Sequence, residues 1–337
     1  MKAIVCEEFG PVESLVYKEI DMPEPGKGEV RVKVKASGVN FPDGLLVQGL
    51  YQVKPDRPFI PGMEFCGEVD ALGEGVKHLK PGQRLICTSQ SYGGFAEYAV
   101  VNARMVMPIP DTLSEQMSDV DAANLMCAHG TAHHALKQRA QLKKGETLVV
   151  LGAAGGTGLA AVQIGKAMGA RVIAVCSSDE KLAIAQANGA DELINYGIKN
   201  GKEDLKDSIK GLTKGKGADV VYDPVGGDAF DACTRSMARN GRLLVVGFAS
   251  GRIPQLPVNL TLVKEYSVVG VFWGSFVMHE PMVFLQNMQE LFAWYKDKQV
   301  SLVIDEVFPL SKTQDALNKV LNRGVKGKVV VVPDSLI

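Results

Sequence analysis

The stretch Leu151-Gly152-Ala153-Ala154-Gly155-Gly156-Thr157-Gly158 decides the fold of this chain of 337 residues. The apolar run Thr147–Val150 before it is typical of a buried parallel strand, and Leu159–Met168 after it has the pattern of a helix. A second apolar run, Arg171–Val175, follows at the spacing that a β-α-β unit requires. In such a unit the glycines let the backbone approach a pyrophosphate, and the N–H groups of the helix N-terminus point at the anion. The predicted dinucleotide contacts in this turn are Ala154, Gly155, Gly156, Thr157 and Gly158.

The end of the second apolar run distinguishes NADPH from NADH. An NAD site carries Asp or Glu about 20 residues past the glycines, where the carboxylate accepts from the ribose 2′-hydroxyl. This chain has Ser177 and Ser178 there, with Lys181 one helical turn further on. Hydroxyl groups and an ammonium would hold a 2′-phosphate by charge-assisted hydrogen bonds. We assign Asp179 and Glu180 to the first turn of a helix, where acids complement the macrodipole, and predict NADPH as the cofactor.

Composition excludes several classes of function. Hydrophobic residues make up 46% of the chain and the formal net charge is −1, so the chain can bury ordinary cores and shows no basic face. We therefore expect neither nucleic acid nor a membrane surface as a partner. The six cysteines lack Cys-x-x-Cys spacing, which fits reduced thiols in a cytoplasmic protein. The chain begins on a strand pattern and charges interrupt its apolar runs, so we expect no signal peptide and no membrane span.

The pattern along the chain changes at about residue 114 and predicts two domains, as the length also does. Before this point, short β-branched runs alternate with Pro and Gly turns, which is typical of an all-β domain. After it, strand and helix patterns alternate up to about residue 260, which is typical of a parallel sheet. We therefore expect a nucleotide-binding domain of residues 121–263, inserted into a mainly β domain made of residues 1–120 and 264–337.

Four further motifs accompany the turn at residues 153–158. They are Ser37-Gly38-Val39-Asn40-Phe41-Pro42-Asp43, Pro61-Gly62-Met63-Glu64-Phe65-Cys66-Gly67, Asp223-Pro224-Val225-Gly226-Gly227 and Gly327-Lys328-Val329. With this set, the chain resembles the medium-chain dehydrogenase/reductase superfamily over essentially its whole length. Within that superfamily it is similar to the zinc-independent NADPH:quinone oxidoreductases of the zeta-crystallin type. The resemblance implies an α/β fold, in which a doubly wound parallel sheet (Rossmann) is inserted into a discontinuous, mainly β GroES-like catalytic domain.

The zinc-dependent relatives offer a direct comparison of ligand positions. They place a Cys where this chain has Asn40, a His where it has Met63, and a third ligand at the position of Cys127. One thiol cannot hold a zinc ion that takes three protein ligands. His129 and His133 have i, i+4 spacing on a helix, but neither a nearby metalloprotease glutamate nor a third ligand accompanies them. We therefore predict no metal.

The resemblance assigns three residues to catalysis. Asn40 lies in the family's active-site loop, where its amide can donate to a carbonyl or to the cofactor; an Asx-turn is the alternative. Tyr51 matches a substrate-side tyrosine, which in related mitochondrial enoyl thioester reductases is the proton donor; a core tyrosine is the alternative. A second tyrosine of some bacterial quinone reductases is Leu45 here. Thr131 falls beside the nicotinamide ring, or is an ordinary helix threonine that bonds back to the preceding turn.

The resemblance also assigns cofactor contacts outside the glycine turn. Tyr196 resembles a tyrosine that packs near the adenosine 2′-phosphate. Arg323 matches an arginine that reaches the cofactor phosphates, with a solvated charge at a helix end as the alternative. Further candidates follow later strands, at the edge where a doubly wound sheet binds ligands. They are Gly226, Gly247, Phe248, Phe272 and Trp273.

The predicted function is hydride transfer from NADPH to a quinone or a similar electron-poor conjugated carbonyl, without zinc. One alternative is a 2-enoyl thioester or 2-alkenal reductase with Tyr51 as the proton donor. An alternative of another class is an NADPH-binding structural or RNA-binding protein. The β-rich stretch Tyr266–Phe272 is expected at one edge of the parallel sheet, where pairing with a second copy would give a homodimer. A helix around Met282–Lys298 could instead cover that edge.

Overall fold

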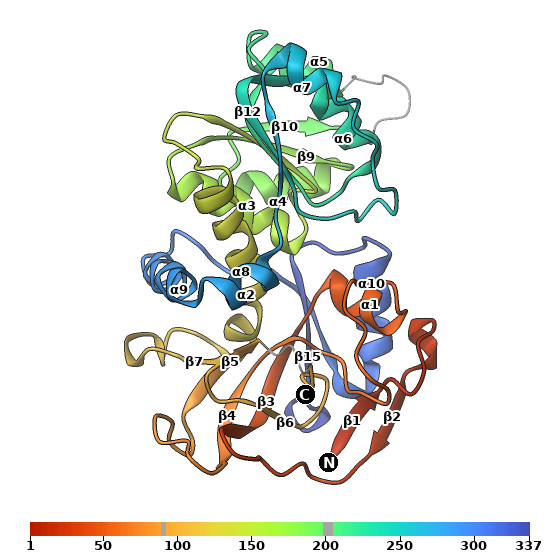
Figure 1. The fold of residues 1–337 in the computed structure, drawn as a ribbon, viewed down its shortest axis with the longest axis vertical. Coiled ribbons are helices and arrows are strands. Elements are labelled where there is room, and N and C mark those ends of the chain that lie inside the picture. The colour runs from red at the N-terminus through yellow and green to blue at the C-terminus, as the bar shows by residue number, and fades with distance from the viewer. Residues whose placement is uncertain (89–91, 198–204) are drawn as a thin grey trace. The chain divides into compact units, whose positions relative to one another are not determined.

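The structure is a computed structural model that describes residues 1–88, 92–197 and 205–337. It divides the chain into two compact units (Figure 1). The first, which we call the β unit, comprises Met1–Cys127 and Ile304–Ile337, and the second, the α/β unit, comprises Ala128–Val303. No helix among the described residues combines the length and the apolar character that crossing a membrane requires.

The β unit is built on a seven-stranded sheet in which β6 pairs with β3 beside the main strand path. Along that path the order is β14 (Ile304–Pro309), β15 (Lys328–Val332), β3 (Glu29–Val39), β4 (Glu64–Leu72), β5 (Arg84–Thr88) and β7 (Val106–Pro108), and β6 spans Tyr98–Asn102. Except for the parallel pair β14–β15, the neighbouring strands are antiparallel. Alternating Val30, Val32 and Val34 of β3 are buried in one core with Phe65 and Leu85. The alternation of apolar and polar residues therefore sets which face of this sheet is covered.

Smaller elements complete the β unit. β1 (Lys2–Val5) and β2 (Val16–Glu19) form an antiparallel ribbon. α1 (Phe41–Val47) follows β3 after one residue and contacts α10 (Thr313–Leu321). A second core gathers residues from both ends of the chain, including Ile4, Val39, Val47, Leu317 and Val329. The C-terminal segment thus returns to the N-terminal sheet, as the resemblance implies.

The α/β unit contains a six-stranded parallel sheet. Its order is β10 (Glu192–Asn195), β9 (Arg171–Cys176), β8 (Thr147–Leu151), β11 (Ala218–Asp223), β12 (Met237–Val245) and β13 (Ser267–Gly270). This is the doubly wound order, and its direction reverses between β8 and β11. Ligands of such sheets bind outside the carboxyl ends of the strands at that switch point. The predicted fold class is therefore confirmed.

Helices cover both faces of this sheet, so every residue of β8 and β11 is buried. Figure 1 shows α3 (Gly156–Ala167) and α4 (Asp179–Ala187) on one side, and α5 (Leu205–Leu212), α6 (Gly227–Thr234) and α7 (Asn259–Lys264) on the other. α8 (Trp273–His279) and α9 (Pro281–Lys296) follow the last strand. α2 (Asp119–His134) begins in the β unit and ends in the α/β unit.

The sequence-based domain limits differ from the division in the structure. We expected residues 121–263 in the nucleotide domain and assigned 264–337 to the catalytic domain, whereas the α/β unit runs from Ala128 to Val303. The reason is β13, which pairs in parallel with β12 and places Val268 opposite Leu243. The α/β unit therefore includes β13 and, after it, α8 and α9. The expected position of the Tyr266–Phe272 stretch, at one edge of that sheet, is confirmed.

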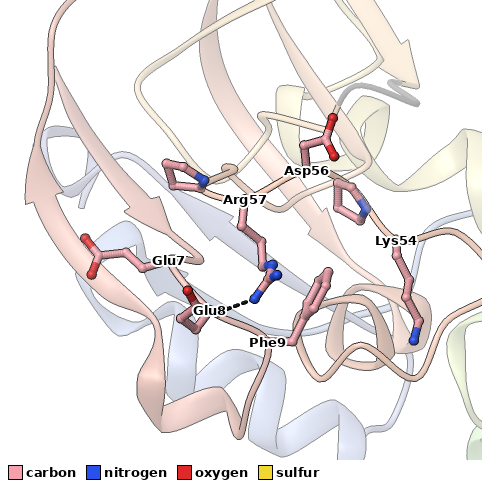
Figure 2. Close-up of a pocket in the computed structure, with 8 residues that line it drawn as sticks. Glu7, Glu8, Phe9, Lys54, Asp56 and Arg57 are labelled. Carbon is pink, nitrogen blue, oxygen red and sulfur yellow. Dashed lines mark hydrogen bonds and ion pairs between the residues drawn. The ribbon is translucent and has the colours of Figure 1, made fainter.

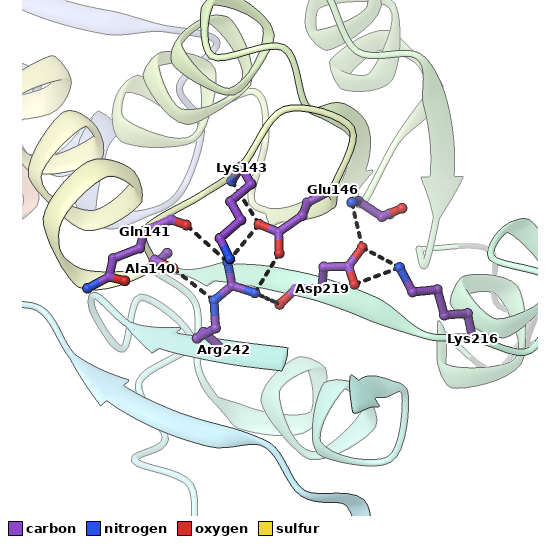
Figure 3. Close-up of polar contacts among 8 residues, drawn as sticks. Ala140, Gln141, Lys143, Glu146, Lys216, Asp219 and Arg242 are labelled. Carbon is purple, nitrogen blue, oxygen red and sulfur yellow. Dashed lines mark hydrogen bonds and ion pairs between the residues drawn. The ribbon is translucent and has the colours of Figure 1, made fainter. Parts of the chain in front are cut away.

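A charged network joins three strands at the amino-terminal end of the parallel sheet (Figure 3). Arg242 of β12 donates to both carboxylate oxygens of Glu146, at 3.0 and 2.7 Å, and to the carbonyl oxygen of Asp219 at 3.2 Å. The carboxylate of Asp219 in turn accepts from the backbone N–H of Thr147 at 2.9 Å and pairs with Lys216. These contacts fix the strands at the end opposite to the ligand crevice.

Candidate active site

The glycine turn joins β8 to α3 by a path that requires glycine. Gly152 has a φ of +61°, and a Cβ on Gly158 would lie 2.1 Å from the Gly152 carbonyl oxygen. The N-cap of α3 is Gly155, which offers no side-chain cap, so the first N–H groups of the helix remain available to a ligand. Thr157 Oγ1 forms a hydrogen bond with the Tyr222 hydroxyl of β11, which ties this side chain to the sheet. The five residues predicted from the turn therefore lie at the N-terminus of α3, at the switch point of the sheet.

The loops after β11 and β12 contribute to the same edge of the sheet. Asp223 ends β11, and its Oδ1 accepts from the backbone N–H groups of Val225 at 2.7 Å and Gly226 at 2.8 Å. Burial raises the pKa of Asp223 to about 6, although these two N–H groups act in the opposite direction. A Cβ on Gly247 would lie 3.2 Å from a backbone oxygen of the β11 loop, and Phe248 would contact a Cβ placed on Gly226. The structure thus brings the predicted Gly226, Gly247 and Phe248 together.

The residues predicted to select NADPH gather at the ends of β9 and β10. Ser178 caps α4, and its Oγ accepts from the backbone N–H of Lys181 at 3.4 Å. Tyr196 follows β10, and its backbone N–H donates to the carbonyl oxygen of Cys176, next to Ser177. Asp179, which we assigned to the helix dipole, also accepts from the side chain of Asn195 at 2.6 Å. Ser177, Ser178, Lys181 and Tyr196 therefore lie at one end of the sheet, with the neighbouring acid engaged by an amide.

A buried set of polar side chains, which we call the polar cluster, lies in the β unit and consists of Asn40, Asp43, Glu64 and Lys328. The amide of Asn40 accepts on Oδ1 from the Lys328 ammonium and donates from Nδ2 to Glu64 Oε2 at 3.0 Å. Lys328 and Glu64 form an ion pair of 3.5 Å, and their side chains are 5% and 0% exposed. Glu64 Oε1 also accepts from the backbone N–H of Cys127 at 2.7 Å. Asn40 is thus held on both sides of its amide.

Asp43 anchors the cluster from the first turn of α1. Its two carboxylate oxygens accept from the backbone N–H groups of Asn40 at 2.8 Å and Met63 at 3.2 Å. Burial raises the pKa of this carboxyl to about 7, although both N–H groups lower it. Burial raises the phenol pKa of Tyr51 to about 12, and the nearby Asp43 carboxylate acts in the same direction. The phenol is therefore held in its protonated form near the polar cluster.

The other predicted site residues belong to different parts of the fold. Thr131 lies on the part of α2 within the α/β unit, where Trp273 packs its indole against Gly130; Phe272 beside it is exposed. Arg323 follows α10 in the β unit with a φ of +57°.

Sequence reasoning missed Asp43, Glu64 and Lys328 as site residues. A signal was present, because Lys328 opens a strand whose other four residues are valine and whose five positions are all buried. Charged side chains are almost never fully buried unless they are paired, so a lysine in such a run predicts a buried partner.

The positions that carry zinc ligands in the zinc-dependent relatives do not fit a zinc ion here. Asn40 presents its oxygen to an ammonium, and a thioether, Met63, stands at the second position. The two spaced histidines have separate partners, since His133 contacts Glu290 at 2.7 Å and His129 faces Gln163 at 3.3 Å. In the part of the chain that the structure describes, no group of three or more His, Cys, Asp or Glu is arranged to hold a metal.

An open surface pocket of the β unit lies apart from these residues (Figure 2). It is lined by Glu7, Glu8, Phe9 and the segment 54–58. Its central cation, Arg57, pairs with Glu8 and stacks over the Phe9 ring, with 4.7 Å to the ring centroid. The pocket contains none of the predicted site residues, and we assign it no role.

Two stretches of the chain match known domain families. Residues 156–294 match the family described as zinc-binding dehydrogenase, and residues 26–111 match the alcohol dehydrogenase GroES-like domain. The quinone oxidoreductase-like protein 2 homolog of Nematostella vectensis is 39% identical over 333 residues, which are 98% of this chain and 88% of that protein.

Solved structures give the same result. A probable oxidoreductase from Mycobacterium abscessus has a TM-score of 0.86 and 35% identity, covering 99% of both chains. Escherichia coli quinone oxidoreductase complexed with NADPH has a TM-score of 0.90 and 27% identity, covering 99% of this chain and 100% of that chain. The protein therefore belongs to the medium-chain dehydrogenase/reductase family, among its quinone oxidoreductase-like members.

Proposed function

We propose that this protein transfers a hydride from NADPH to a quinone or a similar electron-poor conjugated carbonyl, without zinc. The observation that carries the proposal is the uncapped N-terminus of α3 at the switch point of a doubly wound sheet, reached through a turn in which only glycine fits at residue 158. The quinone oxidoreductase of Escherichia coli, whose structure is similar, was solved with NADPH.

The residues of the α/β unit fit such a cofactor. The first N–H groups of α3 would receive the pyrophosphate, because a helix N-terminus favours an anion. Ser177, Ser178 and Lys181 would bind the adenosine 2′-phosphate, with Tyr196 beside them. When bound, NADPH supplies the hydride from C4 of its nicotinamide ring. The protein adds positioning and electrostatic stabilisation, and a proton from solvent completes the reduction of a quinone.

The β unit supplies hydrogen-bond donors for an acceptor substrate. Asn40 Nδ2 carries two hydrogens. It donates one to Glu64 Oε2, at 3.0 Å between nitrogen and oxygen, and the other faces the Gly38 carbonyl oxygen, which lies 3.4 Å from the nitrogen. The second contact is near the limit of hydrogen bonding, so that N–H is the one available to a substrate oxygen. Such a donor stabilises the negative charge that develops on a carbonyl oxygen as hydride arrives.

A second candidate function follows from Tyr51. Its phenol lies near Asp43 of the polar cluster, and a tyrosine phenol is protonated at neutral pH. A protonated phenol near the acceptor site can deliver the proton that a 2-enoyl thioester or 2-alkenal needs after hydride addition. A quinone needs no such donor, because solvent can protonate the hydroquinone oxygens.

A substrate screen tests the proposal. NADPH oxidation would be followed with 1,4-benzoquinone, 9,10-phenanthrenequinone, 2-alkenals and crotonyl-CoA, and each assay repeated with NADH. We expect turnover of the quinones with NADPH and much slower turnover with NADH. Tight NADPH binding without turnover of any of these acceptors would contradict the proposal.

We further propose that β13 pairs with its counterpart in a second copy to form a homodimer. In the described part of the sheet β13 pairs with β12 alone, so its other edge is open. An open strand edge invites pairing with a second copy, and two apolar residues of the preceding helix α7, Leu262 and Val263, are 78% and 73% exposed. Sedimentation equilibrium at micromolar concentration should give the mass of two chains, and V269P should give one. A wild-type mass of one chain would reject the dimer.

A further inference from the structure

The β unit buries a positive charge that the proposed reaction has not used. Lys328 is the first residue of β15, and its side chain is only 5% exposed. Removing an ammonium from water is costly unless acceptors replace the water around it. The structure provides two acceptors, the carboxylate of Glu64 at 3.5 Å and the amide oxygen of Asn40.

Strand register brings these three side chains to one point. β15 is antiparallel to β3 with Val329 opposite Val39, so Lys328 lies across from the residue that follows β3, which is Asn40. β4 is antiparallel to β3 on its other side, with Glu64 opposite Gly38. The ammonium and the carboxylate therefore come from the strands on either side of β3, and the amide comes from the residue directly after β3.

The two charges determine how the Asn40 amide is turned. An ammonium can only donate, so it requires the amide oxygen, and an ionised carboxylate can only accept, so it requires the amide nitrogen. Lys328 faces Oδ1 and Glu64 faces Nδ2. Rotating the amide by half a turn would set donor against donor and acceptor against acceptor. The amide therefore has one orientation, in which the remaining hydrogen of Nδ2 has only a long contact, of 3.4 Å, to the Gly38 carbonyl oxygen.

We propose that Lys328 is the positioning residue of the reductase site, acting through Asn40. This inference rests on the proposed function. The ammonium holds and polarises the Asn40 amide, so that the second N–H of Asn40 can donate to the acceptor oxygen. That hydrogen bond becomes stronger as negative charge develops on the oxygen. The zinc-dependent relatives obtain that positive charge from a metal ion, and this chain obtains it from a lysine of its C-terminal strand.

A purely structural ion pair would behave differently. It would contribute to the free energy of unfolding, and its removal would leave the turnover number of the folded enzyme unchanged. A positioning role in which the Asn40 amide serves the acceptor oxygen predicts a fall in kcat at nearly constant affinity for NADPH, because the predicted phosphate contacts of the cofactor lie outside the polar cluster.

The experiment uses K328M/E64Q, which removes both buried charges and leaves neither unpaired. N40A and the triple variant N40A/K328M/E64Q complete the set, and K27M/E74Q, which removes an exposed ion pair of the same unit, is the matched control. Thermal unfolding, NADPH affinity by fluorescence titration, and kcat and KM for a quinone are measured for each. We expect kcat of K328M/E64Q to fall by about tenfold or more, since loss of an oxyanion donor is costly. NADPH affinity should stay within about twofold, and the triple variant should be no slower than the slower of N40A and K328M/E64Q.

The outcomes separate the two proposals. If wild type reduces quinones with NADPH and folded K328M/E64Q keeps its kcat, the role of Lys328 is overturned and the function stands. If the fold loss of kcat in the triple variant equals the product of the losses in N40A and K328M/E64Q, the role is also overturned, because Lys328 would then act independently of Asn40. If wild type reduces no acceptor with NADPH, the proposed function itself fails. If K328M/E64Q does not fold, K328R and K328Q take its place. K328R should keep most of the wild-type kcat because it keeps the charge, and K328Q should lose it. Equal kcat values for the two variants would contradict the inference.

Discussion

The carboxylate of Asp223 accepts the backbone N–H of Gly226 at 2.8 Å, and so fixes the turn after β11 that carries a predicted cofactor contact. Burial raises the pKa of this carboxyl from 3.8 to about 6. The folded state therefore keeps the proton at pH values where the unfolded state has released it. The contribution of Asp223 to stability is complete below about pH 4 and is lost as the pH rises toward 6.

The resulting prediction concerns D223N, whose amide oxygen can still accept both N–H groups of the turn. Between pH 4 and pH 7, the free energy of unfolding of wild type should fall by about 3 kcal/mol more than that of D223N, as follows from a shift of about two pKa units. Urea unfolding of both proteins at several pH values measures the difference. Parallel curves for the two proteins would show that Asp223 has an ordinary pKa in the folded state.

Lys181 is predicted to distinguish NADPH from NADH. K181A should weaken NADPH binding by about tenfold or more, because one charge-assisted contact to the 2′-phosphate contributes about 1.5–3 kcal/mol. NADH binding should hardly change. Fluorescence titration with both cofactors gives the two affinities, and K216A, at the opposite end of the sheet, is the control. Equal or tighter binding of NADH by wild type would overturn the cofactor assignment.

Gly158 is predicted to be essential to the glycine turn. In G158A the new Cβ would lie 2.1 Å from the Gly152 carbonyl oxygen, so α3 would have to move away from β8. We expect lower thermal stability and loss of NADPH binding. G211A in α5 is the matched control, because a Cβ there meets nothing within 4 Å and alanine favours a helix by about 0.5–1 kcal/mol. Normal NADPH binding by G158A would show that the cofactor lies elsewhere.

Much of the α/β unit could be predicted because its signals are local. The strand, the glycine turn and the helix around Gly158 are adjacent in the chain, and the order of apolar runs gives the parallel sheet. The expected limit at residue 263 differs from the end of the α/β unit at Val303, because periodicity does not show with which unit α8 and α9 pack after β13.

The polar cluster could not be predicted in the same way. Lys328 and Asn40 are 288 positions apart, and only the register of β15 on β3 brings them together. The resemblance indicated Asn40 and the Gly327-Lys328-Val329 motif separately, and it did not connect them. The direction in which the Asn40 amide is turned depends on two buried charges that come from distant strands.

Tyr51 separates the two candidate reactions. With a 2-enoyl thioester or 2-alkenal, Y51F should lower kcat by about 10²–10⁴-fold, which is the usual contribution of a general acid. With a quinone the same change should cost much less. Steady-state kinetics with both substrate classes give the comparison. A change confined to KM would favour quinone reduction, and a large loss of kcat with crotonyl-CoA would favour the second candidate.

In the proposed reaction, NADPH reduces a quinone without zinc, and the Asn40 amide, held by the buried Lys328, takes the role that zinc has in the zinc-dependent relatives. The most direct test is the NADPH-dependent reduction of 9,10-phenanthrenequinone by purified protein before and after EDTA treatment, with zinc measured by elemental analysis in both samples. We predict full activity in both samples and no stoichiometric zinc in either. Close to one zinc per chain, together with loss of activity when EDTA removes it, would contradict the claim.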